Sequence, residues 1–361
     1  MKRICLVYTH LPHYRIPVFR ELLESTEFDY TFYYDPVGID SSIVSGEIND
    51  KAKKIRTFKF GRLMFQPGAL ILSIIGKYDG YIFLGNPYII SNWLIFIILR
   101  FRNRKIFLWT HGWINDDDGL KDYLRTFYYR LANYLMLYGE RARDIGIKKG
   151  FSKENMSVIY NSLNYSLQAD IRVRINNPTK EKLFFLFVGR ITSESKLDIA
   201  IEAMALINKR HSEVKLLIVG DGVEVEKLKL LSKIRNANVL FEGGTYQEEK
   251  LGDFFMRAVA VISPGKVGLL AMHAFAYGVP VITIGNPKIQ MPEYEIIEDG
   301  ITGSLCSELT AESFATKMEF WLHSKEKEAT SVACIKAIEE KYTPQKQKYF
   351  IQTMLAKTLT I

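Results

Sequence analysis

The alternation of two kinds of segment restricts the fold of this chain more than any other feature. Short apolar runs rich in aliphatic and aromatic residues, such as RICLVYT and VKLLIVGDG, alternate with segments whose apolar residues recur at helical spacing. Strands that alternate with helices form parallel sheets covered by helices on both faces. We therefore expect an α/β fold.

The alternation is interrupted once, by the polar and weakly periodic stretch 163–182, which contains Asn-Asn-Pro. Such a stretch is typical of a linker, and 361 residues are enough for two domains. The predicted organisation is listed here: a first domain at 1–165, a linker at 166–182, a second domain at 183–340 and a C-terminal helix at 341–361 that packs back on the first domain. Paired α/β domains bind ligands in a cleft outside the carboxyl ends of their strands.

Composition argues against several classes of protein. The three cysteines are widely spaced and show no disulfide or metal-ligand spacing, which indicates a reducing compartment. The N-terminal apolar run is too short for a signal peptide, and the longest apolar run, 93–99, falls far short of the ~20 residues of a membrane span. No zinc-finger or RNA-recognition pattern occurs, so we expect no nucleic-acid partner. We expect a cytoplasmic protein.

Three predicted strands in the second half end in glycine-bearing turns. The residues of these turns are Gly189 and Arg190, then Gly220, Asp221 and Gly222, then Gly265, Lys266 and Gly268. Glycine lets the backbone approach a ligand, and the helix that follows each turn presents unpaired N–H groups. Any one of the turns could need glycine for its geometry alone.

Two cations accompany the first of these turns. Arg190 can hold two phosphate oxygens, and Lys196 adds a point charge. Together with the three turns they predict a nucleoside diphosphate site in the second domain. The chain has no P-loop lysine motif and no G-x-G-x-x-G after its first strand, which argues against P-loop enzymes and dehydrogenases.

The motifs of the second half, in order, are VGR, IVGDG, SPGKVGL, GVPVI and PEYEIIEDGITG. This order resembles the retaining family 4 glycosyltransferases of the GT-B fold, and the pattern from SPGKVGL to QMPEYE is closest to bacterial polysaccharide enzymes. The resemblance is strong over 183–305 and looser in the first half, where LWTHGW and VIYNSLN fit the order. It implies two Rossmann-like domains facing each other across a cleft, with the acceptor on the first and a nucleotide sugar on the second.

The resemblance also assigns residues to the donor. The family places glutamates at the positions of Gly265 and His273, the first near the transferred sugar and the second on the ribose. Both carboxylates are absent here. His273 is therefore predicted to hold a ribose hydroxyl, with the backbone N–H groups of Lys266 and Val267 at the sugar. The alternative is that His273 is a core histidine.

Two further residues receive roles from the resemblance. Glu295 matches a family glutamate that touches the donor, and the alternative is a surface carboxylate. His111, at the end of KIFLWTH, matches a histidine that faces the transferred sugar, and the alternative is a structural histidine.

The implied reaction moves a sugar from a nucleoside diphosphate sugar, UDP-linked, with retention of configuration. Arg190 and Lys196 would stabilise the departing diphosphate without a metal or a cofactor, and its own oxygen could accept the acceptor's proton. A pair of carboxylates flanking the bond would instead suggest a glycosidase. Because both family glutamates are missing, two alternatives stay open: a non-catalytic nucleotide-sugar-binding subunit, and a sugar epimerase on the same fold.

The acceptor is predicted to be a glycan or a lipid-linked glycan of cell-surface polysaccharide synthesis. His13, Tyr14 and Arg15 follow the first strand and are predicted to bind it. The net charge of +8 and the apolar segment 93–99, followed by four basic residues within 100–105, favour a peripheral position of the first domain on the anionic inner face of the cell membrane. The alternatives are a buried core helix and an ordinary solvated basic surface.

Overall fold

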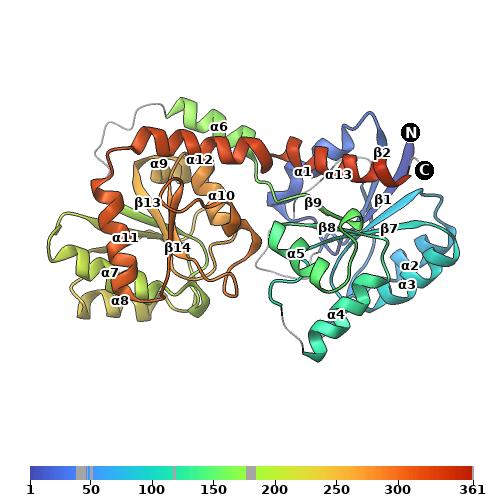
Figure 1. Cartoon of the computed structure of the whole chain (residues 1–361), viewed down its shortest axis with the longest axis horizontal. Coiled ribbons are helices and arrows are strands. Elements are labelled where there is room, and N and C mark those ends of the chain that lie inside the picture. Colours follow the sequence, from blue (N-terminus) through green and yellow to red (C-terminus); the bar gives the residue numbers. More distant parts are fainter. Residues whose placement is uncertain (38–45, 47, 49–51, 117–118, 176–183, 360–361) are drawn as a thin grey trace. The chain divides into compact units, whose positions relative to one another are not determined.

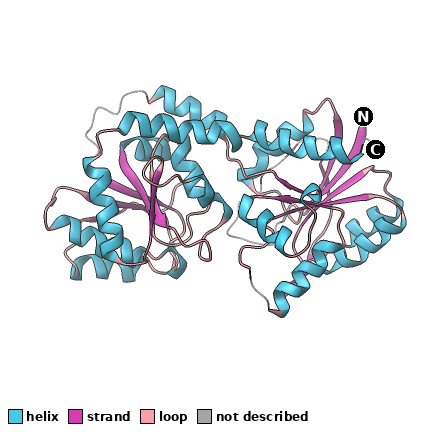
Figure 2. Ribbon diagram, in the orientation of Figure 1, coloured by secondary structure: helices cyan, strands magenta, loops and turns pink. Residues whose placement is uncertain are grey.

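The computed structural model describes residues 1–37, 46, 48, 52–116, 119–175 and 184–359 (Figure 1). It divides the chain into two compact units, Met1–Asn164 with Thr343–Ile361, and Tyr165–Tyr342. Each unit is a parallel sheet with helices on both faces (Figure 2). The predicted α/β class is thus confirmed, and each unit has the Rossmann-like arrangement of strands and helices.

The first unit contains a seven-stranded sheet in the order β3-β2-β1-β6-β7-β8-β9. Its strands are β1 (Lys2–Val7), β2 (Phe28–Tyr34), β3 (Ala52–Lys54), β6 (Gly80–Leu84), β7 (Lys105–Thr110), β8 (Tyr134–Leu137) and β9 (Met156–Val158), beside an antiparallel pair, β4 (Phe58–Phe60) and β5 (Leu63–Phe65). Its helices and 3-10 turns are η1 (His13–Arg15), α1 (Ile16–Leu23), α2 (Pro67–Ile75), α3 (Ile90–Phe101), α4 (Leu120–Arg130), α5 (Glu140–Lys148), η2 (Lys153–Asn155) and α13 (Pro344–Leu359).

Both faces of this sheet are buried, as the near-continuous apolar runs require. Along β1, Ile4 and Leu6 enter one core cluster while Cys5 and Val7 enter the other, which is the period of two of a strand. The C-terminal helix α13 packs against α1 and adds Leu355 to the cluster of Ile4 and Leu6. The end of the chain is therefore part of the first unit's core.

The second unit contains a six-stranded sheet in the order β12-β11-β10-β13-β14-β15. Its strands are β10 (Phe184–Val188), β11 (Lys215–Val219), β12 (Val239–Phe241), β13 (Ala258–Ser263), β14 (Val281–Ile284) and β15 (Gly303–Cys306). Its helices and 3-10 turns are α6 (Tyr165–Arg174), η3 (Ser193–Ser195), α7 (Leu197–Asn208), α8 (Val225–Ile234), α9 (Glu248–Arg257), α10 (Leu269–Ala276), η4 (Pro292–Ile296), α11 (Ala311–His323) and α12 (Lys327–Lys341).

The stretch 166–182, predicted to be a linker, contains a helix in its first half. Residues up to Arg174 belong to α6, which packs against α9 and α10, and the Arg172 guanidinium donates to the carbonyl of Ala276. The helix buries only Gln168 and Ile171, so its apolar pattern is too weak to be seen in the sequence, and tertiary contacts hold it. The rest of the stretch, 176–182, lies outside the described residues.

All six strands of the second unit run parallel, so the turns that follow them leave the sheet at one edge. This topology collects the three predicted glycine turns, which follow β10, β11 and β13. The loops that precede the strands lie at the opposite edge of the sheet.

Candidate functional site

The glycine turns after β10 and β11 contact each other backbone to backbone. Gly189 N–H donates to the Val219 carbonyl at 3.0 Å, and Ile191 N–H donates to the Asp221 carbonyl at 2.9 Å. A Cβ placed on Gly220, whose φ is +154°, would lie 1.9 Å from the Gly189 carbonyl oxygen. Position 220 therefore tolerates only glycine, because any side chain would separate the two turns.

The neighbouring residues of the β11 turn extend this network. A Cβ on Gly222 would lie 2.0 Å from the Ile191 carbonyl oxygen. Asp221, which is exposed, accepts a hydrogen bond at Oδ2 from Gly244 N–H at 2.9 Å. The predicted donor residue Asp221 thus also fixes the loop after β12.

The turn after β13 packs against the turn that contains η3. Gly265 N–H donates to the Ser195 carbonyl at 3.2 Å, and Lys266 Nζ lies 3.0 Å from Glu194 Oε2. A Cβ on Gly265 would lie 2.0 Å from the Glu194 carbonyl oxygen. A glutamate at 265, which the resemblance implies, would not fit here, because the backbone of Glu194 fills the space that a side chain would need.

The two predicted phosphate-binding cations belong to one loop. Arg190 and Lys196 are both exposed, at the beginning and the end of the segment that joins β10 to α7. Lys196 has φ +52° and ψ +37°, the left-handed region that a lysine rarely adopts. Non-glycine residues held in this region cost on the order of 1 kcal/mol and cluster at functional sites.

Gln290 is a residue that the sequence did not single out. It is buried, and its Nε2 donates to the Gly265 carbonyl at 3.0 Å and to Thr283 Oγ1 at 2.8 Å. Its Oε1 accepts from Val267 N–H at 3.0 Å. The Val267 N–H group, which was predicted to face the sugar, therefore donates its hydrogen bond to Gln290 instead. Only the tertiary structure reveals this role, because an amide side chain six residues past β14 has no distinctive spacing.

Gly268 precedes α10 with φ +49°, and a Cβ placed there would meet nothing within 4 Å. Its backbone conformation, not a lack of space, favours glycine at this position. The start of α10 therefore remains open on the side where a Cβ would point, as the predicted donor contact requires.

His273 has a carboxylate partner within the second unit. Its Nε2 donates to Glu248 Oε1 at 2.7 Å, and Tyr277 Oη donates to the same oxygen at 2.8 Å. The imidazole also packs on Phe255, with ring centroids 4.5 Å apart. Burial raises the pKa of the Glu248 carboxyl, but hydrogen bonds from His273, Tyr277 and Gln168 outweigh it and lower the pKa below its ordinary value. The ribose contact of His273 stays a prediction, and the side chain also holds Glu248 in place.

Glu295 lies on η4, where it is half-buried, and Glu293 on the same turn is buried. Because η4 packs against α10, Glu295 belongs to the same part of the second unit as His273. Its contact with the donor stays a prediction.

In the first unit, His111 follows β7 and packs on Tyr138, with ring centroids 4.6 Å apart. The Arg15 guanidinium lies 5.1 Å from the same Tyr138 ring and donates to Tyr8 Oη at 2.9 Å. Burial, and then the charge of Arg15, lower the pKa of His111 to about 4. His111 is therefore a neutral imidazole at neutral pH.

The acceptor residues predicted after β1 differ in exposure. His13 is exposed and Tyr14 half-buried, but only 6% of Arg15 is exposed. An acceptor could not reach this guanidinium, which packs on the rings of Tyr8, Tyr14, Trp109 and Tyr138. The prediction for Arg15 is corrected on this point: the sequence could not show that its cation is covered by aromatic rings.

Residues 169–339 match the family model of the glycosyl transferases group 1. The matched residues lie within the second unit, which is therefore similar to a group 1 glycosyltransferase domain. The chain is 29% identical over 192 residues to an uncharacterized 41.2 kDa protein in the cps region of Klebsiella pneumoniae, covering 50% of this chain and 51% of that protein. It is 28% identical over 163 residues to the sulfoquinovosyl transferase SQD2 of Arabidopsis thaliana, covering 44% and 30%. The matched region thus spans about half or less of each relative's length.

Solved structures with a similar fold cover nearly the whole chain. Alr3699/HepE of Anabaena, crystallised with UDP, has a TM-score of 0.74 at 16% identity and covers 99% of this chain and 100% of that chain. A putative UDP-N-acetylglucosamine 2-epimerase of Listeria monocytogenes has a TM-score of 0.67 at 11% identity and covers 100% and 97%. The fold is GT-B. At such identities the likeness concerns the fold alone.

The steric role of Gly265 can be tested by substitution. Gly265→Ala should lower the unfolding temperature of the second unit by several degrees, since a Cβ forces the β13 turn away from Glu194. Gly119→Ala is the matched control, because a Cβ there meets nothing within 4 Å. Differential scanning calorimetry of both variants measures the effect. Equal melting temperatures for the two variants would contradict the steric explanation.

The neutral state of His111 has a consequence for pH dependence. Between pH 6.5 and pH 4 the unfolded chain binds a proton at this histidine and the folded chain does not, so stability falls as the pH falls. At pH 5 this loss is on the order of 2 kcal/mol relative to pH 7.5. His111→Asn should remove it, so its stability relative to the wild type should rise on acidification.

Urea unfolding at pH 5 and pH 7.5, followed by tryptophan fluorescence, measures this difference. His13→Asn, which removes an exposed histidine of the same unit, controls for the loss of one imidazole. A stability difference between wild type and His111→Asn that does not change with pH would refute the buried neutral imidazole.

Proposed function

We propose that the protein transfers a sugar from a UDP-linked nucleotide sugar to a glycan or lipid-linked glycan, with retention of configuration and without a metal. The observation that carries this proposal is the edge of the second unit where the glycine turns after β10, β11 and β13 contact one another and where Arg190 and Lys196 are exposed. The match of this unit to the group 1 family model supports it. Fixed backbone with exposed cations is what a diphosphate needs from a protein.

The chemistry assigns roles to these groups. When the bond between the sugar and the diphosphate breaks, negative charge grows on the phosphate oxygens. Arg190 and Lys196 would stabilise that charge because both are held on one short loop. A phosphate oxygen would take the proton of the acceptor hydroxyl on the same face, so that no protein carboxylate is needed. A neutral His111 would serve as a hydrogen-bond partner of the transferred sugar rather than as a cation.

Arg190→Ala should reduce the transfer rate at least roughly tenfold, about 1.4 kcal/mol of barrier. Lys196→Gly should have a similar effect while relieving the left-handed backbone, so loss of activity would not come from loss of stability. The measurement is transfer of radiolabelled sugar by the purified protein with a panel of nucleoside diphosphate sugars.

Lys233→Ala is the control, since it removes an exposed lysine of α8 in the same unit. Wild-type turnover in both Arg190→Ala and Lys196→Gly would refute the assignment of the diphosphate site. Loss of activity in EDTA that Mg²⁺ or Mn²⁺ restores would refute the metal-free mechanism.

Position 265 has no space for a glutamate side chain. For this reason two other functions are kept as alternatives. A non-catalytic subunit would bind the donor but neither transfer nor hydrolyse it. An epimerase would convert the donor alone, and the Listeria structure shows that such proteins share the fold. Analysis of products after incubation with donor alone, and with donor plus acceptor, separates all three functions.

We also propose that the first unit rests on an anionic membrane surface. Helix α3 buries Ile95, Phe96 and Leu99 in the core, but its other face exposes Leu94, Ile97 and Phe101. The adjacent α2 exposes three isoleucines, listed here: Ile71, Ile74 and Ile75. Helix α3, which contains the apolar segment 93–99, is thus buried in the core on one side and exposes apolar side chains on the other. Exposed apolar surface of this kind often marks an interaction site.

Two basic residues near this surface form hydrogen bonds with backbone carbonyls of the first unit. Arg100 donates to the carbonyls of Leu131 and Arg130, and Arg102 donates to that of Gly76. Their charge is held in place beside the apolar face, which suits attraction to anionic lipid. No helix in the described ranges is long and apolar enough to cross a bilayer.

The protein should sediment with vesicles that contain anionic lipid at low salt and less so at high salt. Phe101→Ser should weaken binding, because this ring is 86% exposed and would enter the lipid interface. Tyr349→Ser, which removes an exposed ring from α13, should leave binding unchanged. Absence of sedimentation at low salt would rule out the membrane role.

A further inference from the structure

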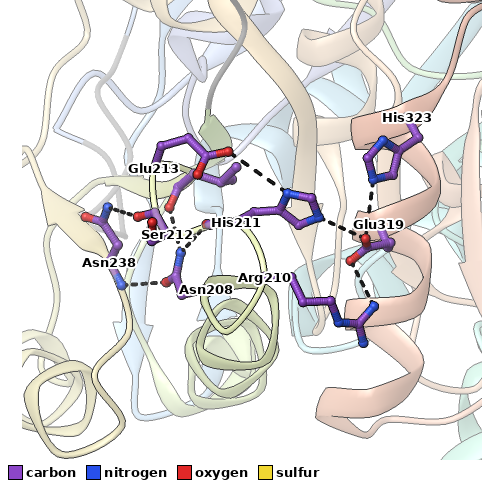
Figure 3. Close-up of polar contacts among 9 residues, drawn as sticks. Asn208, Arg210, His211, Ser212, Glu213, Asn238, Glu319 and His323 are labelled. Atoms are coloured by element: carbon purple, nitrogen blue, oxygen red, sulfur yellow. Dashed lines mark hydrogen bonds and ion pairs between the residues drawn. The ribbon is translucent and has the colours of Figure 1, made fainter.

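Three side chains of types that can bind a metal ion lie close together at the surface of the second unit (Figure 3). Glu319 and His323 lie one helical turn apart on α11, and His211 lies in the loop between α7 and β11. One ligand atom from each side chain lies within 4.8 Å of the other two. Neither the glycine turns nor the diphosphate chemistry involves these residues.

The distances fit a metal ion. His211 Nε2 lies 2.9 Å from Glu319 Oε1, and His323 Nε2 lies 3.3 Å from the same oxygen. Ligands held about 2.1 Å from a tetrahedral zinc ion are roughly 3.4 Å apart. Small side-chain movements would therefore bring all three atoms onto one ion.

The surroundings orient the ligands. Arg210 Nη1 lies 3.8 Å from Glu319 Oε2, which leaves Oε1 turned toward the two imidazoles. On the far side of His211, Nδ1 lies 4.0 Å from Glu213 Oε1. This distance is longer than a hydrogen bond, but a small movement of Glu213 would let Nδ1 donate to it, and such a contact orients the ligating histidine in many zinc sites.

The backbone that carries His211 is also fixed. Asn208 Nδ2 donates to the carbonyls of His211 at 3.0 Å and Val214 at 2.9 Å, and its Oδ1 accepts from Asn238 N–H at 2.8 Å (Figure 3). Helix α7, which ends at Asn208, packs against α11. The three ligands therefore come from two elements that already hold each other in place.

The cluster has an accessible side. The exposed fractions of the side chains are 23% for His211, 28% for Glu319 and 64% for His323. Glu319 and His323 also line a surface pocket of about 1030 Å³. An ion could enter from this side, and water could complete its coordination.

We propose that His211, Glu319 and His323 bind one divalent transition-metal ion of the Zn²⁺ class. Two imidazoles and one carboxylate bind ions of this class in preference to Mg²⁺ or Ca²⁺, which favour ligand sets made of oxygen atoms. Because His211 precedes β11, the site lies at the edge of the sheet opposite the glycine turns and takes no part in the transfer chemistry. Its role is to tie the end of α11 to the α7–β11 loop. Without a metal, Glu319 accepts from both imidazoles.

The test uses full-length, tag-free protein stripped with EDTA and dialysed. Titration with ZnCl₂ in a calorimeter should give one ion per chain, and zinc should raise the unfolding temperature. His211→Gln and His323→Gln should each weaken binding roughly tenfold or more and abolish the thermal shift. His10→Gln, which removes a histidine of the first unit, should change neither.

Cobalt(II) provides a spectroscopic check, because d–d absorption should appear on titration of the wild type and disappear in His323→Gln. This variant should fold normally, as circular dichroism can verify, since His323 lies largely in solvent. Absence of binding at about 100 μM zinc, or binding that survives both histidine substitutions, overturns the proposal. Both outcomes are independent of whether the protein transfers a sugar.

Discussion

The close contact of backbone with backbone at the carboxyl edge of the second sheet is the constraint on which the candidate site depends. Gly220 lies against the carbonyl of Gly189, Gly222 against that of Ile191, and Gly265 against that of Glu194. Since no side chain fits at these three contacts, the turns form one surface rather than three independent loops. The positions of Arg190 and Lys196 depend on it, because both belong to the loop that the other two turns contact.

The absent glutamates of the resembling family have different physical explanations at the two positions. At 265 the main chain of Glu194 occupies the space that a side chain would need. At 273 an imidazole stands in place of a carboxylate and holds Glu248 from the neighbouring helix. A carboxylate thus remains near α10, contributed by another element. Its pKa is lowered by His273 and Tyr277, which keeps it ionised at neutral pH.

In the first unit, the buried Arg15 determines the chemistry of its surroundings. Packed among aromatic rings and hydrogen-bonded to Tyr8, it places a positive charge close enough to His111 to affect its pKa. Burial, and then this charge, lower the pKa of His111, so the neutral imidazole can offer one donor and one acceptor to a ligand. The aromatic rings that surround Arg15 therefore help to set the charge near His111, while His13 lies at the surface.

The sequence by itself determined the α/β class, the division near residue 165 and the three glycine turns, because strand and helix periods and turn glycines are local properties. Contacts between distant segments decided the rest. Helix α6 has too little apolar pattern to be predicted and exists through its packing, as Arg172 on the Ala276 carbonyl illustrates. The burial of Arg15, the engagement of Val267 by Gln290 and the meeting of His211 with α11 join residues far apart in the chain. Such pairings leave no spacing in a single sequence, since they arise only when the sheets and helices have packed.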